Sequence, residues 1–183
     1  MTQRSKWTHD MVLIAMFAVL IAVCSWISIP MTIPFTLQTL GVFLTCSLLG
    51  GKRATLTILI YILLGAVGLP VFSGMAGGIA VLLNTTGGYI VGFLASALVY
   101  WAVEAVFGRR WPLQLISMIV GLIVCYAFGT IWYMILYTQQ TGSIGLLTVL
   151  GYCVFPFIIP DLVKIALAML LSGRIRKVWK KPI

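Results

Sequence analysis

Two oppositely charged residues, Asp161 and Lys164, lie inside an apolar stretch near the C-terminus, residues 144–173. Their spacing of about one helical turn lets both side chains project from one face of a helix. A charge at bilayer depth costs about 2.5–3.5 kcal/mol on insertion scales. A charged pair at this depth therefore indicates a structural or functional role that offsets this cost. The two could form a structural ion pair between helices or bind a polar ligand. We favour the ligand site, because a membrane interior is less costly to build without charge.

The rest of the composition is typical of a membrane protein. Of 183 residues, 62% are hydrophobic and 8% charged, which excludes an ordinary soluble domain. The net charge of +9 could suggest a nucleic-acid partner, but its distribution argues for membrane orientation instead. The four cysteines are scattered singly and form no metal-binding pattern, so we interpret them as small buried hydrophobic residues.

Six apolar stretches predict an all-α membrane protein with six transmembrane helices, in one domain covering residues 1–183. The expected spans are residues 11–29, 35–49, 54–69, 87–107, 113–137 and 144–173. The second and third are short, because a bilayer needs about 17–25 residues per helix. With six spans, every lysine and arginine except Lys164 falls on one side. The positive-inside rule then places both termini in the cytoplasm.

Two segments on the expected outer side differ from ordinary loops. Residues 30–39 hold two prolines among hydroxyl and amide groups, which indicates an ordered, extended segment. Residues 70–88 hold five glycines among apolar residues, which predicts a loop dipping into the outer leaflet or a frayed pair of helices. At about 1.5 Å per residue, Asp161 lies about 20 Å from Arg174, the inner end of the last span. The charged pair is therefore expected beneath these segments.

Polar groups near this depth complete the candidate site. Pro160 removes an intrahelical hydrogen bond beside Asp161, so a kink and a local opening are expected there. Asn84 stands where the outer segment enters the fourth span and could bind a ligand or cap the helix. Tyr89 follows it, and Gln38 lies at the end of the proline-containing segment. All three side chains can hydrogen-bond to a polar ligand.

The residues needed for enzyme chemistry are missing. The only histidine, His9, lies in the polar leader, and no Ser/His/Asp set, carboxylate pair or metal cluster can be assembled. The GxxxxGK[ST] frame of a phosphate-binding loop is also absent. We therefore expect no enzyme, no cofactor and no metal. If the protein drives uptake uphill, a partner supplies the energy.

The first span carries a face of small residues at helical spacing. It consists of Ala15, Ala18 and Ala22. Such a face allows another helix to approach closely, either from a partner or from the same chain.

Several segments together resemble the BioY family, the biotin-specific S components of energy-coupling factor (ECF) transporters. They are IPFTLQTLG at 33–41, GLPVF at 68–72, the glycine pair at 77–78, TGGYIVGF at 86–93 and DLVK at 161–164. The resemblance implies six helices in the cytoplasmic membrane of a prokaryote that bind biotin near the outer face. A transmembrane T component and two ATPase subunits would energise uptake.

The resemblance also implies roles for individual residues. The family's Asp-x-x-Lys corresponds to Asp161 and Lys164, and its outer polar residue to Asn84. The family's docking face for the T component corresponds to Ala15, Ala18 and Ala22. The N–H groups of the biotin ureido ring would donate to the carboxylate, and its carbonyl would accept from the ammonium. The alternatives are an S component for another vitamin and a membrane scaffold with a structural Asp–Lys pair.

Overall fold

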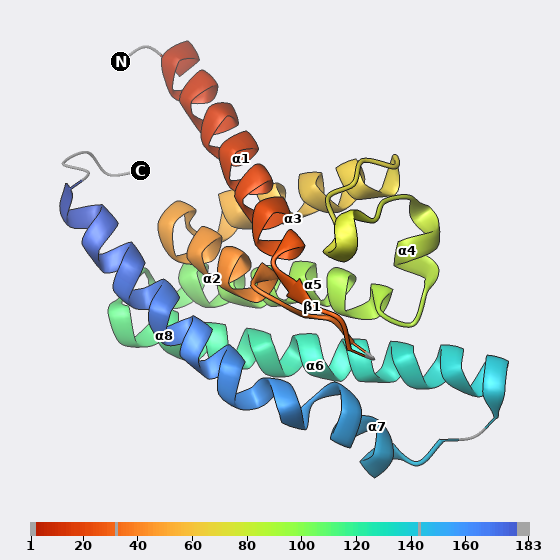
Figure 1. The fold of residues 1–183 in the computed structure, drawn as a ribbon. Coiled ribbons are helices and arrows are strands. Elements are labelled where there is room, and N and C mark those ends of the chain that lie inside the picture. The colour runs from red at the N-terminus through yellow and green to blue at the C-terminus, as the bar shows by residue number, and fades with distance from the viewer. Residues whose placement is uncertain (1–2, 32, 143, 179–183) are drawn as a thin grey trace.

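The computed structural model describes residues 3–31, 33–142 and 144–178, and it is almost wholly helical (Figure 1). In chain order the elements are α1 (Gln3–Trp26), β1 (Ser28–Ile29), β2 (Phe35–Thr36), α2 (Gln38–Leu49), α3 (Gly51–Ala66), η1 (Ser73–Met75), α4 (Ile79–Leu83), α5 (Gly87–Phe107), α6 (Trp111–Thr141), α7 (Leu146–Cys153) and α8 (Phe155–Val178). The two short strands pair antiparallel, with Ser28 opposite Thr36. The end of the basic tail, from residue 179, lies outside the described residues.

The helices have the composition of membrane segments. Among the described residues, α1, α5, α6 and α8 are long and apolar enough to cross a bilayer. The helices α2 and α3, with 12 and 16 residues, are shorter than the usual span. Large apolar side chains such as Leu147, Ile159 and Leu170 are exposed on the outer surface. Lipid accounts for such a surface, and the expectation of a helical membrane protein is confirmed.

The last predicted span is not one helix. Residues 144–173 contain α7 and most of α8, which are separated at Val154 (φ −127°, ψ −57°). Pro156 lies in the first turn of α8, where a missing N–H costs no intrahelical hydrogen bond, so it suits the start of a new helix. Pro160, where we expected a kink, lies inside α8 without ending it. The helix α5, in contrast, has the predicted bounds 87–107.

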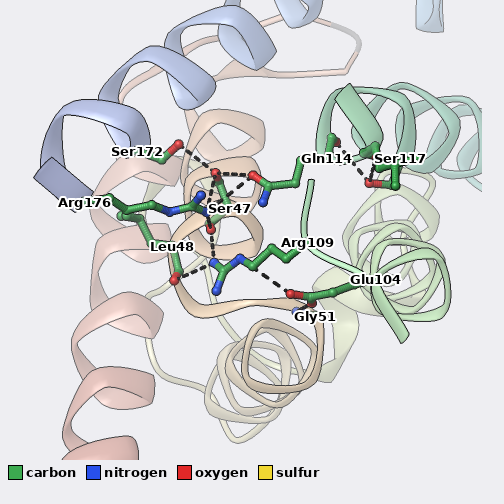
Figure 2. Close-up of polar contacts among 10 residues, drawn as sticks. Ser47, Leu48, Gly51, Glu104, Arg109, Gln114, Ser117, Ser172 and Arg176 are labelled. Carbon is green, nitrogen blue, oxygen red and sulfur yellow. Dashed lines mark hydrogen bonds and ion pairs between the residues drawn. The ribbon is translucent and has the colours of Figure 1, made fainter. Parts of the chain in front are cut away.

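Basic residues gather at one end of the molecule, which we call the basic end. It includes the start of α3, the end of α5 and the last turn of α8, and there Arg53 pairs with Asp10 of α1 at 2.9 Å. In Figure 2, Arg109 and Arg176 both donate to the carbonyl of Ser47 at the end of α2. Cations at a helix C-terminus satisfy carbonyls that have no intrahelical donor, so these arginines cap α2.

The next helix is capped by an acid from the same network. Glu104 of α5 accepts a hydrogen bond from the backbone N–H of Gly51, the first residue of α3, and its other oxygen lies 3.5 Å from Arg109 (Figure 2). A carboxylate is favourable at a helix N-terminus. The tight turn at Gly50 (φ +82°) is thereby attached to α5.

The small-residue face of α1 is mostly turned inward. Ala18 and Ala22 are 3% and 4% exposed and belong to the central hydrophobic cluster. A Cβ placed on Gly41 of α2 would lie 3.3 Å from the Cα of Ile21, so α1 and α2 approach closely here. The predicted docking face is thus only partly accessible in the single chain. Two of its alanines make contacts within the chain, and only Ala15 is exposed.

The glycine-rich segment between α3 and α5 is held by hydrogen bonds. Trp26 donates to the carbonyl of Pro70 at 2.8 Å, and Ser25 donates to that of Val71 at 2.6 Å. The N–H of Gly78, a residue with φ +99°, donates to Gly65 at 2.7 Å. The segment contains η1 and α4 and forms a wall rather than a solvated loop.

Helices α5 and α6 pack closely as an antiparallel pair (Figure 1). A Cβ on Gly129 would collide with the ring of Tyr89, and one on Gly121 with the side chain of Ser96. Glycine at these positions lets the two backbones approach. The close approach brings Tyr89 of α5 and Tyr126 of α6 to the same cavity.

Candidate ligand-binding site

A cavity of about 130 Å³ opens at the end of the molecule opposite the basic end. Helices α2, α4, α5, α6, α7 and α8 line it, together with the segment around β2 and residues of η1 and its flank. Most of its wall is apolar, including Ile33, Phe72, Phe93, Leu122 and Phe157. A mostly apolar cavity with a few convergent polar groups is typical of a small-molecule site.

The charged pair predicted from the sequence lies in this cavity. Lys164 Nζ is 2.7 Å from Asp161 Oδ1, and the two residues are 4% and 2% exposed. Burying two charges is costly unless they are paired and further hydrogen-bonded. The surroundings of each charge therefore decide whether the pair is stable.

The carboxylate of Asp161 accepts two further hydrogen bonds. Thr39 Oγ1 of α2 donates to Oδ1 at 2.9 Å, and the hydroxyl of Tyr126 of α6 donates to Oδ2 at 2.6 Å. Hydrogen bonds to an ionised group are stronger than neutral ones. Three helices thus converge on one side chain.

The ammonium group of Lys164 is held by the extended segment. Nζ donates to the carbonyl of Thr36 in β2 at 2.8 Å and lies 4.3 Å from the ring centroid of Phe35. A cation over an aromatic face is attracted by the ring. The segment around β2 is therefore anchored to α8 through Lys164.

The two charged groups keep unused hydrogen-bonding capacity toward the cavity. A carboxylate offers about four acceptor positions and an ammonium three donors. Within the described part of the chain, three donors reach Asp161, which leaves one position on Oδ2. Lys164 uses two donors, which leaves one. The pair can thus offer one acceptor beside one donor to a ligand.

Two other predicted residues line the same cavity. Gln38 is 5% exposed and its Nε2 donates to the hydroxyl of Tyr61 at 2.9 Å. The hydroxyl of Tyr89 lies 3.4 Å from Oγ1 of Thr130. The structure brings Gln38, Tyr89, Asp161 and Lys164 together.

Asn84 is not brought to the cavity. Its side chain is exposed, and its Oδ1 accepts from the backbone N–H of Thr85 at 2.7 Å. Its carbonyl accepts from Trp132 at 3.0 Å, and the residue at the N-cap of α5 is Thr86. The expectation that Asn84 caps α5 is therefore wrong, and its side chain bonds to its own turn.

Sequence reasoning missed Thr39 and Tyr126. Thr39 lies within the IPFTLQTLG segment, but an isolated hydroxyl in an apolar helix carries no specific signal. Tyr126 is one of 7 tyrosines, and only the tertiary structure shows that it faces Asp161. No group of three or more potential metal ligands gathers within the described residues.

The comparison with protein families agrees with this architecture. The model of the BioY family matches residues 1–181. The chain belongs to the BioY family. The biotin transporter BioY of Thermotoga maritima is 39% identical over 165 residues, covering 88% of this chain and 92% of that protein. The probable biotin transporter BioY of Pyrococcus horikoshii is 38% identical over 165 residues, covering 90% and 94%.

A solved structure is also similar to this BioY chain. It is described as the S-component for biotin from an ECF-type ABC transporter, with a TM-score of 0.82 and 28% sequence identity. The match covers 97% of this chain and 95% of that one. The BioY resemblance inferred from the sequence segments is thus confirmed over nearly the whole chain.

We predict that Tyr126 stabilises the buried carboxylate. Replacing it with phenylalanine removes a hydrogen bond to an ionised group and should lower the free energy of unfolding by about 1.5–3 kcal/mol. Tyr152→Phe is the matched control, because this tyrosine is 60% exposed and makes no hydrogen bond recorded among the described residues. Unfolding of both variants in detergent, followed by circular dichroism, measures the difference. Equal stabilities would contradict the role of Tyr126.

Proposed function

We propose that the protein is the substrate-binding S component of an ECF transporter and binds biotin in the cavity around Asp161 and Lys164. The observation that carries the proposal is the unused acceptor and donor of this buried pair, placed side by side on the cavity wall. A merely structural ion pair would be better placed away from a cavity, where neither partner would face unfilled space. The names of the relatives support biotin as the ligand.

The ureido group of biotin complements the pair. It presents N–H donors next to one polar carbonyl. One N–H can donate to the free position on Asp161 Oδ2, and the carbonyl can accept from Lys164 Nζ. Charge-assisted hydrogen bonds of this kind are strong in a desolvated site. A ligand carboxylate at this place would be repelled by Asp161.

The remaining cavity suits the rest of biotin. Phe72, Phe93 and Phe157 offer apolar contact to a thioether ring and an aliphatic chain. Lys164 is the only cation among the described lining residues, and it is already paired. We therefore expect the biotin carboxylate to point toward the mouth, near hydroxyls such as those of Ser73 and Thr86.

We also propose that six segments cross the membrane, with both termini in the cytoplasm. The arrangement at the basic end supports this, because α3 and α6 begin there and α2, α5 and α8 end there. The short helices α2 and α3 would cross with the help of the segments that continue them at the cavity end. The positive-inside rule places the basic end on the cytoplasmic side. The location that we propose is the cytoplasmic membrane of a prokaryote.

The proposed partners are a T component and two ATPase subunits. The structural similarity to an S component of an ECF-type ABC transporter supports them. The exposed apolar face of α1, with Ala15, Met16 and Val19, is the part of the predicted docking helix that stays accessible.

Substitution of the pair tests the ligand site. Asp161→Asn and Lys164→Met should each weaken biotin binding at least about a hundredfold, because each removes a charged partner of the ligand. The double variant should regain stability relative to either single one, but not binding. Labelled biotin and the purified protein give the affinities.

A second ion pair provides the control. Asp10 and Arg53 form a pair at the basic end, and Asp10→Asn with Arg53→Met should leave biotin affinity unchanged. The ligand assignment fails if the double variant of Asp161 and Lys164 binds biotin as tightly as the wild type. Wild-type protein that binds another vitamin instead of biotin would contradict the proposed substrate.

The orientation can be tested at the two ends of α6. In a background without native cysteines, a cysteine at Gln140 should react with an impermeant thiol reagent added outside intact cells. A cysteine at Trp111 should react only after the membrane is opened. Both positions are exposed in the fold, so access depends on the membrane alone. The reverse pattern would contradict the topology.

A further inference from the structure

A chain of hydrogen bonds connects the glycine-rich wall to the cavity through Tyr61. The hydroxyl of Tyr61 donates to the carbonyl of Val71 at 2.9 Å, and Nε2 of Gln38 donates to the hydroxyl of Tyr61 at 2.9 Å. A carbonyl can only accept, so the single proton of the phenol is used at Val71. The group of Gln38 that meets the phenol oxygen must then be its NH₂. The oxygen and nitrogen of a glutamine amide are told apart by their hydrogen-bond partners, and here those partners fix the orientation of the Gln38 amide.

The carbonyl oxygen of Gln38 is consequently left for the cavity. No donor to Oε1 is recorded among the described residues, and Gln38 lines the cavity. Its neighbours in sequence contact the charged pair, since Thr36 accepts from Lys164 and Thr39 donates to Asp161. The oxygen is therefore an acceptor in the same cavity as the charged pair.

The position of Tyr61 is itself fixed. Its ring is 1% exposed and meets the ring of Phe72 edge to face, with centroids 5.6 Å apart. Phe72 in turn lies against Gly65, where any Cβ would collide with its ring. The Val71 carbonyl also accepts from Ser25 at 2.6 Å, so the acceptor at the end of the chain cannot move freely.

A cyclic urea needs two acceptors, and the charged pair supplies one. Of the two N–H groups beside the carbonyl, only one can use the free position on Asp161. We propose that Tyr61 is a positioning residue that fixes Gln38, so that Oε1 accepts the second N–H of the ligand. The site then selects a cyclic urea over a lactam, which has a single N–H. This inference depends on the proposed function, because it assigns the second half of the same ligand head.

The test compares biotin with its two lactam analogues, in each of which one ring N–H is replaced by CH₂. Wild-type protein should bind the analogue that lacks the N–H facing Gln38 about three- to tenfold more weakly than biotin. Tyr61→Phe frees the amide to turn its NH₂ toward that N–H. The variant should lose about three- to tenfold in affinity for biotin and less than twofold for that analogue.

Two further variants keep the test decisive. Tyr100→Phe is the matched control, because Tyr100 is 2% exposed and its hydroxyl has no hydrogen-bond partner among the described residues. Its biotin affinity should equal that of the wild type. Gln38→Met removes the acceptor, so this variant should no longer prefer biotin over that analogue. The result tests the role of Gln38 independently of whether Tyr61→Phe folds. Adding Tyr61→Phe to Gln38→Met should cost no further affinity.

Specific outcomes would overturn the inference. It fails if Tyr61→Phe weakens biotin and both analogues equally, since that is a general packing effect. It also fails if Tyr61→Phe binds like the wild type, or if Gln38→Met keeps the wild-type preference. Wild-type protein that does not bind biotin at all would overturn the proposed function and this inference with it. Tight wild-type binding without these differences would overturn only the role of Tyr61.

Discussion

The structure depends on keeping two opposite charges inside an apolar protein. Asp161 and Lys164 can stay buried only because other groups complete their hydrogen bonds. Thr39, Tyr126 and the carbonyl of Thr36 do so, and they come from α2, α6 and β2. The site thus forms at the place where α2, α6 and β2 contact α8. Their meeting also leaves the free acceptor and donor that a ligand can use.

The opposite end of the molecule helps to hold this arrangement. Arg109 and Arg176 cap the last turn of α2 (Figure 2). The first turn of the same helix carries Gln38 and Thr39. This helix has 12 residues, so one short element connects the basic end with the ligand site. The basic residues that signal orientation in the sequence therefore hold one end of a helix whose other end lines the cavity.

The sequence predicted what depends on local pattern. Apolar length predicted α5 with its observed bounds, and an i,i+3 spacing predicted the contact between Asp161 and Lys164. Five segments predicted the family. In each case the information lies within a short stretch of chain or in residue types that are rare in membranes.

Features that depend on the packing of distant segments could not be predicted. Thr39 and Asp161 are 122 positions apart, and nothing in the sequence indicates that they meet. Asn84 was assigned to the site because of its residue type, but its side chain bonds to its own turn. Ala18 and Ala22 fit a docking face equally well on either side of α1, and only the fold shows that they face inward.

The most direct test of the account is an experimental structure with biotin bound. We predict that the ureido ring lies within hydrogen-bond distance of both Asp161 Oδ2 and Lys164 Nζ, with the carboxylate of biotin toward the mouth of the cavity. A structure in which the carboxylate of biotin binds Lys164 and the ureido ring lies at the mouth would contradict the account.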